Sequence, residues 1–283
     1  MIEAIDNIGR VVQHRLALAG GIIILLLVCI AVLAPYLAPH DPERVDLNQS
    51  LAGPDANFPM GTNKLGRCVM SQMICGARIT LGAGALVVLT TAAIGMMMGI
   101  VSGYFGGLID EMIMRFVDMM LALPGIILAL IIAGLLGPGV FNLMLALAVT
   151  GWTGFARVVR STVLSLKELA FIESARALGA SNFYIIRVHI IPNCISPVIV
   201  LATFGMARAI LAISALSFLG LGSQPPNFDW GSMLKESVMY MRTAPHLVVY
   251  PGLAIMISVL AFNFFGDGLR DYFDVKANHK PEY

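Results

Sequence analysis

The residues of this sequence best suited to recognition chemistry form one polar stretch, Glu173–Pro192, which lies between long apolar runs. Glu173 and Arg176 are three residues apart, so their charges can pair along one face of a helix. Gly179 can adopt the left-handed conformation that ends a helix and turns the chain sharply. These features predict ion pairing and helix docking, and a membrane protein that folds such a unit between two spans presents a helix that a partner can bind.

This stretch resembles the cytoplasmic coupling loop of ABC-importer permeases, whose pattern is Glu-Ala-Ala, three residues, Gly, nine residues, Ile, one residue, Leu-Pro. Glu173, Gly179 and Pro192 occupy the Glu, Gly and Pro positions in register. Three positions depart from the pattern, with Ser174 in place of Ala, His189 in place of Ile and Ile191 in place of Leu. The ending His189–Asn193 is similar to the variant of the peptide and nickel importer branch.

In that family the coupling helix sits in a groove on a cytoplasmic ATPase subunit, and the resemblance implies the same contact here. The residues to which it assigns this coupling are Glu173, Ser174, Ala175, Arg176, Leu178, Gly179, Ala180 and Pro192. Pro192 is expected to begin the fifth helix and to link the loop to it rigidly. The alternative is an ordinary amphipathic helix that packs only on its own protein.

The composition is that of a membrane protein. Of 283 residues, 58% are hydrophobic and 12% are charged, whereas a soluble domain carries about 25% charged residues. The net charge of +1 gives no sign of nucleic-acid binding. The five histidines include no pair at ligand spacing and the four cysteines match no zinc pattern, so neither a metal site nor a cofactor is predicted.

The long uncharged runs predict six transmembrane helices, because one span needs about 20 apolar residues. The run 119–156 is long enough for a hairpin of two spans, with its turn at Gly137–Gly139 and a kink at Pro124. The remaining spans are predicted in the runs 16–37, 79–109, 190–216 and 247–266. The predicted fold is all-α and integral to the membrane, and the resemblance implies the type I permease fold of ABC importers with a cytoplasmic coupling helix.

These spans divide the chain into expected segments. The segments are a cytoplasmic N-terminus (1–15), a first transmembrane helix (16–37), an extracytoplasmic segment (38–78), a five-helix permease core (79–267) with the coupling loop at 161–189, and a cytoplasmic tail (268–283).

Two local patterns lie in and after the second span. Gly95, Gly99 and Gly103 share one helical face at a spacing of four, which predicts close approach of a neighbouring helix. A polar loop is expected after this span, in which Arg115 and Asp118 can pair three residues apart.

The segment before the second span resembles the family pattern Gly-Thr-Asp, two residues, Gly-Arg-Asp, two residues, Ser-Arg, starting at Gly61. Three positions depart from that pattern: Asn63, Cys68 and Gln72. The missing carboxylates put in doubt an ion pair of Arg67. Cys68 and Cys75 share this segment, so a disulfide and two free thiols both stay open, and free thiols are preferred.

Two stretches near the C-terminus also resemble this permease family, namely Ser217–Gly222 with the following Gln-Pro-Pro, and 261–271 (AFNFFGDGLRD). Between them, residues 229–242 are expected to form a surface helix with Trp230 at the membrane interface.

Arg208 lies within the otherwise uncharged run 190–216. A charge at mid-bilayer costs about 3 kcal/mol on insertion scales, so Arg208 either lines a translocation path or lies near the outer end and snorkels. Asn263, in the last span, is a second polar candidate for the path.

The distribution of lysine and arginine predicts the orientation. With six spans and both termini inside, the inner segments hold 11 of these residues and the outer segments hold 6. The coupling stretch is therefore expected to face the cytoplasm. The predicted location is the bacterial inner (cytoplasmic) membrane, with multiple passes through the bilayer and both termini cytoplasmic.

No phosphate-binding loop, zinc-protease motif or nucleophile elbow occurs, so the chain is not expected to be an enzyme. The resemblance implies the permease subunit of a binding-protein-dependent ABC importer, of the C type in the dipeptide, oligopeptide and nickel family. It implies as partners a second permease, two ATPase subunits and an extracytoplasmic solute-binding protein. Short peptides and nickel both stay open as the cargo.

The alternative function is a self-sufficient channel or secondary carrier. Such a protein would normally carry acidic groups within its spans or a filter-like loop. The predicted spans contain neither, which disfavours this alternative.

Overall fold

The computed structural model describes residues 2–278, and within this range the chain is helical and contains no β-strand. The helices are α1 (Ile2–Val32), α2 (Ala34–Leu37), α3 (Val69–Phe105), α4 (Gly107–Leu121), α5 (Gly125–Leu136), α6 (Val140–Lys167), α7 (Ala170–Ala177), α8 (Asn182–Ile185), α9 (Ile191–Phe218), α10 (Trp230–Ser237) and α11 (His246–Asn278). Short 3-10 turns occupy Leu47–Gln49 and Val238–Tyr240, and a π-helical turn occupies Ile186–Ile190.

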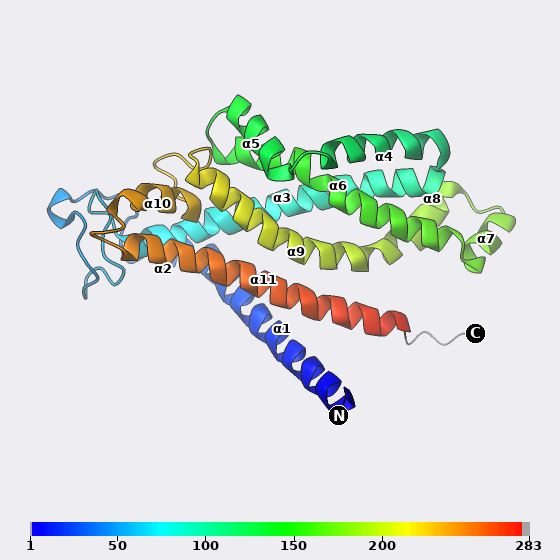
Figure 1. Cartoon of the computed structure of the whole chain (residues 1–283), viewed down its shortest axis with the longest axis horizontal. Helices are drawn as coiled ribbons and strands as arrows, with labels where there is room; N and C mark the ends of the chain where they lie inside the picture. Colours follow the sequence, from blue (N-terminus) through cyan, green and yellow to red (C-terminus); the bar gives the residue numbers. More distant parts are fainter. Residues whose placement is uncertain (1, 279–283) are drawn as a thin grey trace.

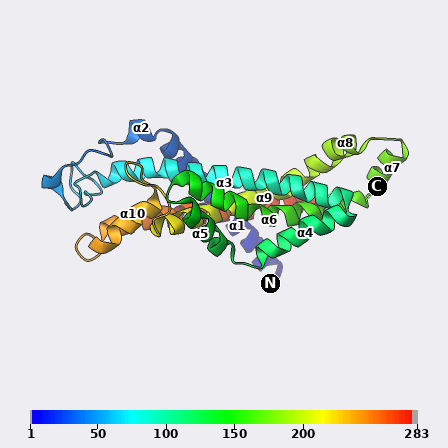
Figure 2. The ribbon, with the colours of Figure 1, turned by 90° about the horizontal axis from the view of Figure 1, so that it is seen from above.

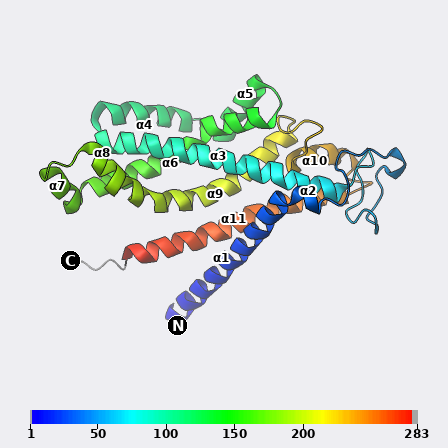
Figure 3. The same ribbon diagram turned by 180° about the vertical axis from the view of Figure 1, so that it is seen from behind.

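Four long helices, α3, α6, α9 and α11, run along the length of the molecule (Figure 1). α7 lies at one end of this bundle, and α10 with the segment 38–68 lies at the other; we call these the α7 end and the α10 end (Figures 2 and 3). α1 packs along α11, and the start of α1 and the end of α11 both point toward the α7 end.

Five helical stretches are long and apolar enough to cross a membrane: Arg15–Val32, Val69–Phe105, Val140–Lys167, Asn182–Phe218 and His246–Phe273. α4 and α5 give a sixth when they are counted as one broken span. The predicted count of six spans agrees with the structure in this form.

The kink expected at Pro124 is a full break, since the axes of α4 and α5 differ by 86°. Pro124 directly precedes the first residue of α5, where a missing N–H leaves no helical hydrogen bond unmade. The predicted hairpin turn is present, with φ of +85° at Gly137 and +149° at Gly139, values that residues with a Cβ rarely adopt.

The expected close contact at the glycine ridge is confirmed between α3 and α6. A Cβ on Gly95 would lie 2.4 Å from Phe155 Cβ, and one on Gly99 would lie 2.7 Å from Ala156 O. A Cβ on Gly103 would lie 2.8 Å from the Cβ of Val163. Because the two helices meet at backbone distance over about two turns, they form one rigid pair.

Several element boundaries differ from the expected ones. The first helix ends at Val32, and residues 34–37 form the separate α2. Residues 69–78, expected in the extracytoplasmic segment, form the first turns of α3, and the expected polar loop around Asp110 is part of α4. α11 continues to Asn278, so residues 268–278 of the expected tail are helical; residues 1 and 279–283 lie outside the described range.

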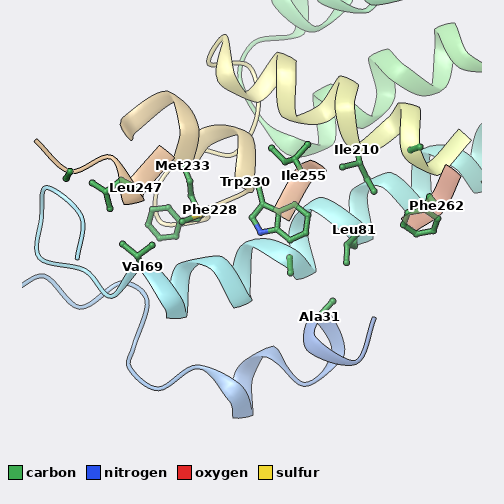
Figure 4. Close-up of a cluster of buried hydrophobic side chains, with 13 residues drawn as sticks. Ala31, Val69, Leu81, Ile210, Phe228, Trp230, Met233, Leu247, Ile255 and Phe262 are labelled. Atoms are coloured by element: carbon green, nitrogen blue, oxygen red, sulfur yellow. The ribbon is translucent and has the colours of Figure 1, made fainter. Parts of the chain in front are cut away.

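A buried hydrophobic cluster joins α10 to α3, α9 and α11 (Figure 4). Trp230 lies in this cluster with an exposed fraction of 2%, and its indole Nε1 donates to Met73 O at 3.1 Å. The prediction that Trp230 lies at the membrane interface is therefore wrong. The 3-10 turn and α10 cover part of 229–242 as expected, but the side chain points into the protein because its single polar atom finds a partner on α3.

Candidate coupling site

The coupling stretch folds as a short amphipathic helix, α7, that projects at one end of the bundle. Ile172, on the side of α7 that faces the bundle, is fully buried. Leu178, directly after the helix, has an exposed fraction of 89%, and Phe171 at its start is also exposed. One side of α7 thus packs on this chain, while apolar side chains on another side stay uncovered.

Gly179 ends α7 as the sequence predicts. Its φ is +86°, in the left-handed region. The N–H of Ala180 donates to Ala175 O at 3.0 Å, and the N–H of Gly179 donates to Arg176 O at 2.9 Å. This pair of bonds is the Schellman arrangement, which satisfies the last carbonyls of the helix and fixes the direction in which the chain leaves it.

The chain rejoins the span earlier than expected. Ser181 caps α8, its Oγ accepting from Tyr184 N at 3.3 Å. The π-helical turn Ile186–Ile190 then leads directly into α9, so the helical stretch runs from Asn182 to Phe218. α9 itself begins at Ile191, so Pro192 lies in its first turn as predicted, but the helical stretch does not start there. The wider turn just before Pro192 lies where its ring would otherwise crowd the preceding carbonyls.

Three isoleucines fix the coupling stretch to the bundle. Ile172, Ile185 and Ile190 are all fully buried, in one cluster with residues of α3 and α6. The partners in that cluster are Ile100, Tyr104, Val159, Val163 and Cys194. Burying a side chain of this size stabilises the attachment by about 1.5–3 kcal/mol. Ile172 provides this anchor for α7, and Ile185 and Ile190 anchor the segment that follows it, although most residues of α7 are exposed.

The charges of the stretch are arranged differently from the expectation. Glu173 and Arg176 form no ion pair within the described part of the chain. The Arg176 guanidinium instead lies over the ring of Tyr104, 5.4 Å from its centroid. The Tyr104 hydroxyl donates to Asn182 Oδ1 at 2.8 Å. Neither Tyr104 nor Asn182 was predicted as a site residue, because each acquires its role only through contacts about 70 residues away in the chain.

The neighbouring helices are linked by ion pairs close to this end. Arg160 of α6 donates from Nε and Nη2 to the two carboxylate oxygens of Asp110 at 2.5 and 2.6 Å. Arg157 pairs with Asp118 at 2.5 Å. The predicted pair of Arg115 with Asp118 is wrong, since Arg115 pairs with Glu111 at 2.9 Å, one helical turn before it.

Arg208 and Asn263 lie away from α7, on α9 and α11. Arg208 is exposed, and its Nε has one long contact with Phe204 O at 3.4 Å. Its neighbours on α9, Met206 and Ile210, lie beside Gly84 of α3, at 3.4 and 3.6 Å from where a Cβ on that glycine would be, and Gly84 is near the middle of its helix. The structure thus places Arg208 near mid-height of the bundle. Asn263 is partly buried and donates to the Val259 carbonyl of its own helix at 2.9 Å.

Two positions that depart from the family pattern contact each other at the α10 end. Asn63 Nδ2 donates to Gln72 Oε1 at 3.2 Å, and Gln72 is buried. Asn63 Oδ1 also accepts from the backbone N–H groups of Leu65 and Arg67. The Arg67 guanidinium lies over the Phe228 ring at 5.3 Å.

All four cysteines are free thiols, Cys68 and Cys75 among them, in agreement with the preferred expectation.

A family model described as "Binding-protein-dependent transport system inner membrane component" matches residues 95–279. A second, described as "N-terminal TM domain of oligopeptide transport permease C", matches residues 6–54. Together they cover the coupling stretch and the first span.

Among curated proteins, a glutathione transport system permease protein of Pectobacterium atrosepticum is 42% identical over 268 residues, which is 94% of this chain and 89% of that protein. A dipeptide transport system permease protein of Alkalihalophilus pseudofirmus is 42% identical over 264 residues, 93% of this chain and 87% of that protein.

Solved structures share the fold. An inward-facing form of a methionine ABC transporter matches with a TM-score of 0.54 and 20% identity, over 69% of this chain and 94% of that chain. An amino acid ABC transporter with histidines matches with a TM-score of 0.52 and 19% identity, over 73% of this chain and 92% of that chain.

Proposed function

The chain belongs to the family of inner membrane components of binding-protein-dependent transport systems, and from this premise we propose that it carries short peptides and that α7 is where an ATPase subunit binds. As a member of this family it is a multi-pass membrane protein and a permease subunit of an ABC transporter. The proposal concerns the cargo, the partners and the way in which they are coupled.

The observation that carries the coupling proposal is the uncovered apolar surface at α7. Leu178 is 89% exposed beside a helix whose other side is anchored by the fully buried Ile172. A rigidly held helix with exposed apolar side chains is suited to docking in a groove of a second protein. Glu173, Ser174, Ala175, Arg176 and Ala180 surround Leu178 and Gly179 and are proposed to form the rest of this contact.

In the proposed mechanism, two ATPase subunits hydrolyse ATP and this chain converts their closure into a movement of its spans. A second permease subunit completes the pathway, and an extracytoplasmic solute-binding protein delivers the cargo. ATP binding moves α7, and the helix from Asn182 through Pro192 to Phe218 carries that movement into the bilayer. The pathway then opens alternately to the two sides.

The proposed orientation puts the α7 end in the cytoplasm. This end carries the excess of arginine and lysine that cytoplasmic loops show. The start of α1 and the end of α11 point the same way, so both termini are proposed to be cytoplasmic, in the bacterial inner membrane.

A short peptide is proposed as the cargo in preference to nickel, because the two relatives described above are named for glutathione and dipeptide transport at 42% identity. Arg208 and Asn263 are proposed to line the pathway. An exposed cation near mid-height of an apolar helix is costly in lipid, and a pathway that passes carboxylate-bearing peptides would hydrate it.

The first experiment is affinity purification of the tagged chain from its native membrane in mild detergent, with mass spectrometry of the proteins that accompany it. Two ATPases and a second permease are expected. A self-sufficient channel or carrier would emerge alone and would move substrate in liposomes by itself, and that outcome would overturn the proposal.

Substitution at Gly179 tests the coupling role. Valine at a φ of +86° is strained by about 1–3 kcal/mol, so Gly179→Val should misdirect the chain after α7 and separate ATP hydrolysis from uptake in the assembled complex. Gly179→Asn is the matched control, because asparagine tolerates the left-handed region. Unchanged uptake in Gly179→Val would contradict the role.

A further inference from the structure

Residues from both sides of α7 and from α7 itself converge on one residue, Tyr104. Tyr104 lies in the last turn of α3 and has an exposed fraction of 5%. Lys167, the last residue of α6, donates from Nζ to the carbonyls of Gly103 and Tyr104 at 3.2 and 2.9 Å. Arg176 of α7 lies over its ring, and Asn182 of α8 accepts from its hydroxyl at 2.8 Å.

We propose that Tyr104 is the positioning residue that passes the movement of the coupling stretch to α3, with its hydroxyl bond to Asn182 as the specific link. This inference rests on the proposed role of α7 and adds a second route into the bilayer. The continuous helix from Asn182 leads into α9, whereas Tyr104 leads into α3.

The hydroxyl bond is distinguished from the surrounding packing by its direction. The buried isoleucines hold the coupling stretch against α3, α6 and α9 through apolar contact, which is non-directional. The bond from a buried ring to Asn182 fixes both distance and angle. The same ring also holds Arg176, so a displacement of α7 acts on Tyr104 from two sides.

α3 can carry this displacement to the other end of the molecule. It has 37 residues without a break, which corresponds to about 55 Å at 1.5 Å per residue. The glycine ridge locks it to α6 along the half that contains Tyr104. At its far half, Thr80 Oγ1 accepts from the backbone N–H of Trp230 at 3.2 Å, and Met73 O accepts from the indole.

The test is Tyr104→Phe in the fully assembled transporter, reconstituted with its ATPases, second permease and binding protein. The variant keeps the ring and its contact with Arg176 and removes the hydroxyl. We expect an assembled complex that hydrolyses ATP, with the amount of a dipeptide taken up per ATP reduced about fivefold, the factor that matches one ordinary hydrogen bond. A purely structural role would lower the amount of complex and leave uptake per ATP unchanged.

Variants at Asn182 provide the second measurement. Asn182 is exposed, so Asn182→Ala should fold and should reduce uptake per ATP as Tyr104→Phe does. The double variant should be no worse than either single variant, because both remove the same bond. Asn182→Asp keeps an acceptor and should restore coupling. Tyr36→Phe, at an exposed tyrosine of α2 at the α10 end, is the control.

Uptake per ATP that stays at the wild-type value in both Tyr104→Phe and Asn182→Ala would overturn the proposal. If Gly179→Val still separates hydrolysis from uptake in the same preparation, the docking role of α7 stands and Tyr104 is only part of the packing. If Gly179→Val is also without effect, the proposed function of α7 fails with it.

Discussion

The α10 end and the α7 end of the molecule differ in how far their apolar and polar side chains are buried. At the α10 end, Asp229 and Trp230 are buried, and Asp229 accepts from the N–H groups of Ser223, Gly231 and Ser232 at 2.9–3.0 Å. At the α7 end, Leu178 is left uncovered and α7 is fixed by its other side. Contacts within this chain thus enclose Asp229 and Trp230 at the α10 end, whereas Leu178 at the α7 end stays uncovered.

This difference shows how a subunit can be both stable and responsive. Buried hydrogen bonds stabilise the fold at the α10 end, because the Asp229 carboxylate, the Trp230 indole and the Gln72 amide all find partners within the chain. Apolar side chains that stay exposed at the α7 end add little to the stability of the isolated chain. They can instead be buried when another protein binds there, which would stabilise the complex. The comparison predicts that substitutions at the two ends affect different measurements.

The largest loss of stability is expected from Trp230→Ala. The side chain is almost fully buried among α3, α9 and α11, so its removal should lower the free energy of unfolding by about 3–5 kcal/mol. Denaturant titration of the purified chain in detergent measures this. Trp230→Phe keeps most of the ring and loses the bond to Met73, so its loss should be smaller. An equal loss for the two variants would contradict the comparison.

The neutral pair at the α10 end should tolerate a charge only when its partner changes too. Gln72→Arg buries a cation beside Asn63 with no counter-charge, which should cost about 3 kcal/mol in the same titration. Asn63→Asp supplies that charge, so the double variant should recover most of the loss. A double variant no more stable than Gln72→Arg would show that the two side chains are not coupled.

A smaller effect, on binding alone, is expected from Leu178→Ala. The side chain has few contacts within this chain, so stability should change by less than about 0.5 kcal/mol. The affinity for the ATPase subunit should fall about tenfold, as for an exposed apolar anchor of an interface, measured by titrating purified ATPase onto the permease in detergent. Leu47→Ala, exposed at the α10 end, is the control and should leave the affinity unchanged.

The smallest effect, on the mobility of the denatured chain, is expected from reducing the cysteines. Cys68 and Cys75 are free thiols, so the mobility of the denatured chain should be the same with and without reductant. In native protein a maleimide should label Cys75 faster than Cys68, because Cys68 is buried and Cys75 only partly so. A shift in mobility on reduction would show a disulfide and would contradict the structure at this end.

The sequence was informative wherever a local rule decides the structure. Gly179 was predicted to end a helix and does so through two backbone bonds within six residues. The glycine ridge on α3 and the turn at Gly137–Gly139 were predicted for the same reason, since only glycine fits those backbone positions. The coupling residues themselves stay a prediction until an ATPase is tested against them.

The predictions that were wrong concern partners that are distant in the sequence. Trp230 was expected at the interface, but its indole finds Met73 about 160 residues away. Asp118 was expected to pair with Arg115 in a polar loop, but it lies in α4 and pairs with Arg157 of α6. In both cases the polar atoms of the side chain could meet several partners, and only the packing of the helices selected one.

The sequence by itself therefore determined that this chain crosses the membrane, that the chain turns at Gly137–Gly139, and that a helix ends at Gly179, because apolar length and glycine conformations act over a few residues. The tertiary structure alone decided that α7 and α8 contact α3 at Tyr104, and that Trp230 and Asp229 are buried and hydrogen-bonded at the α10 end. Those contacts depend on how helices far apart in the chain are oriented, which no local pattern specifies.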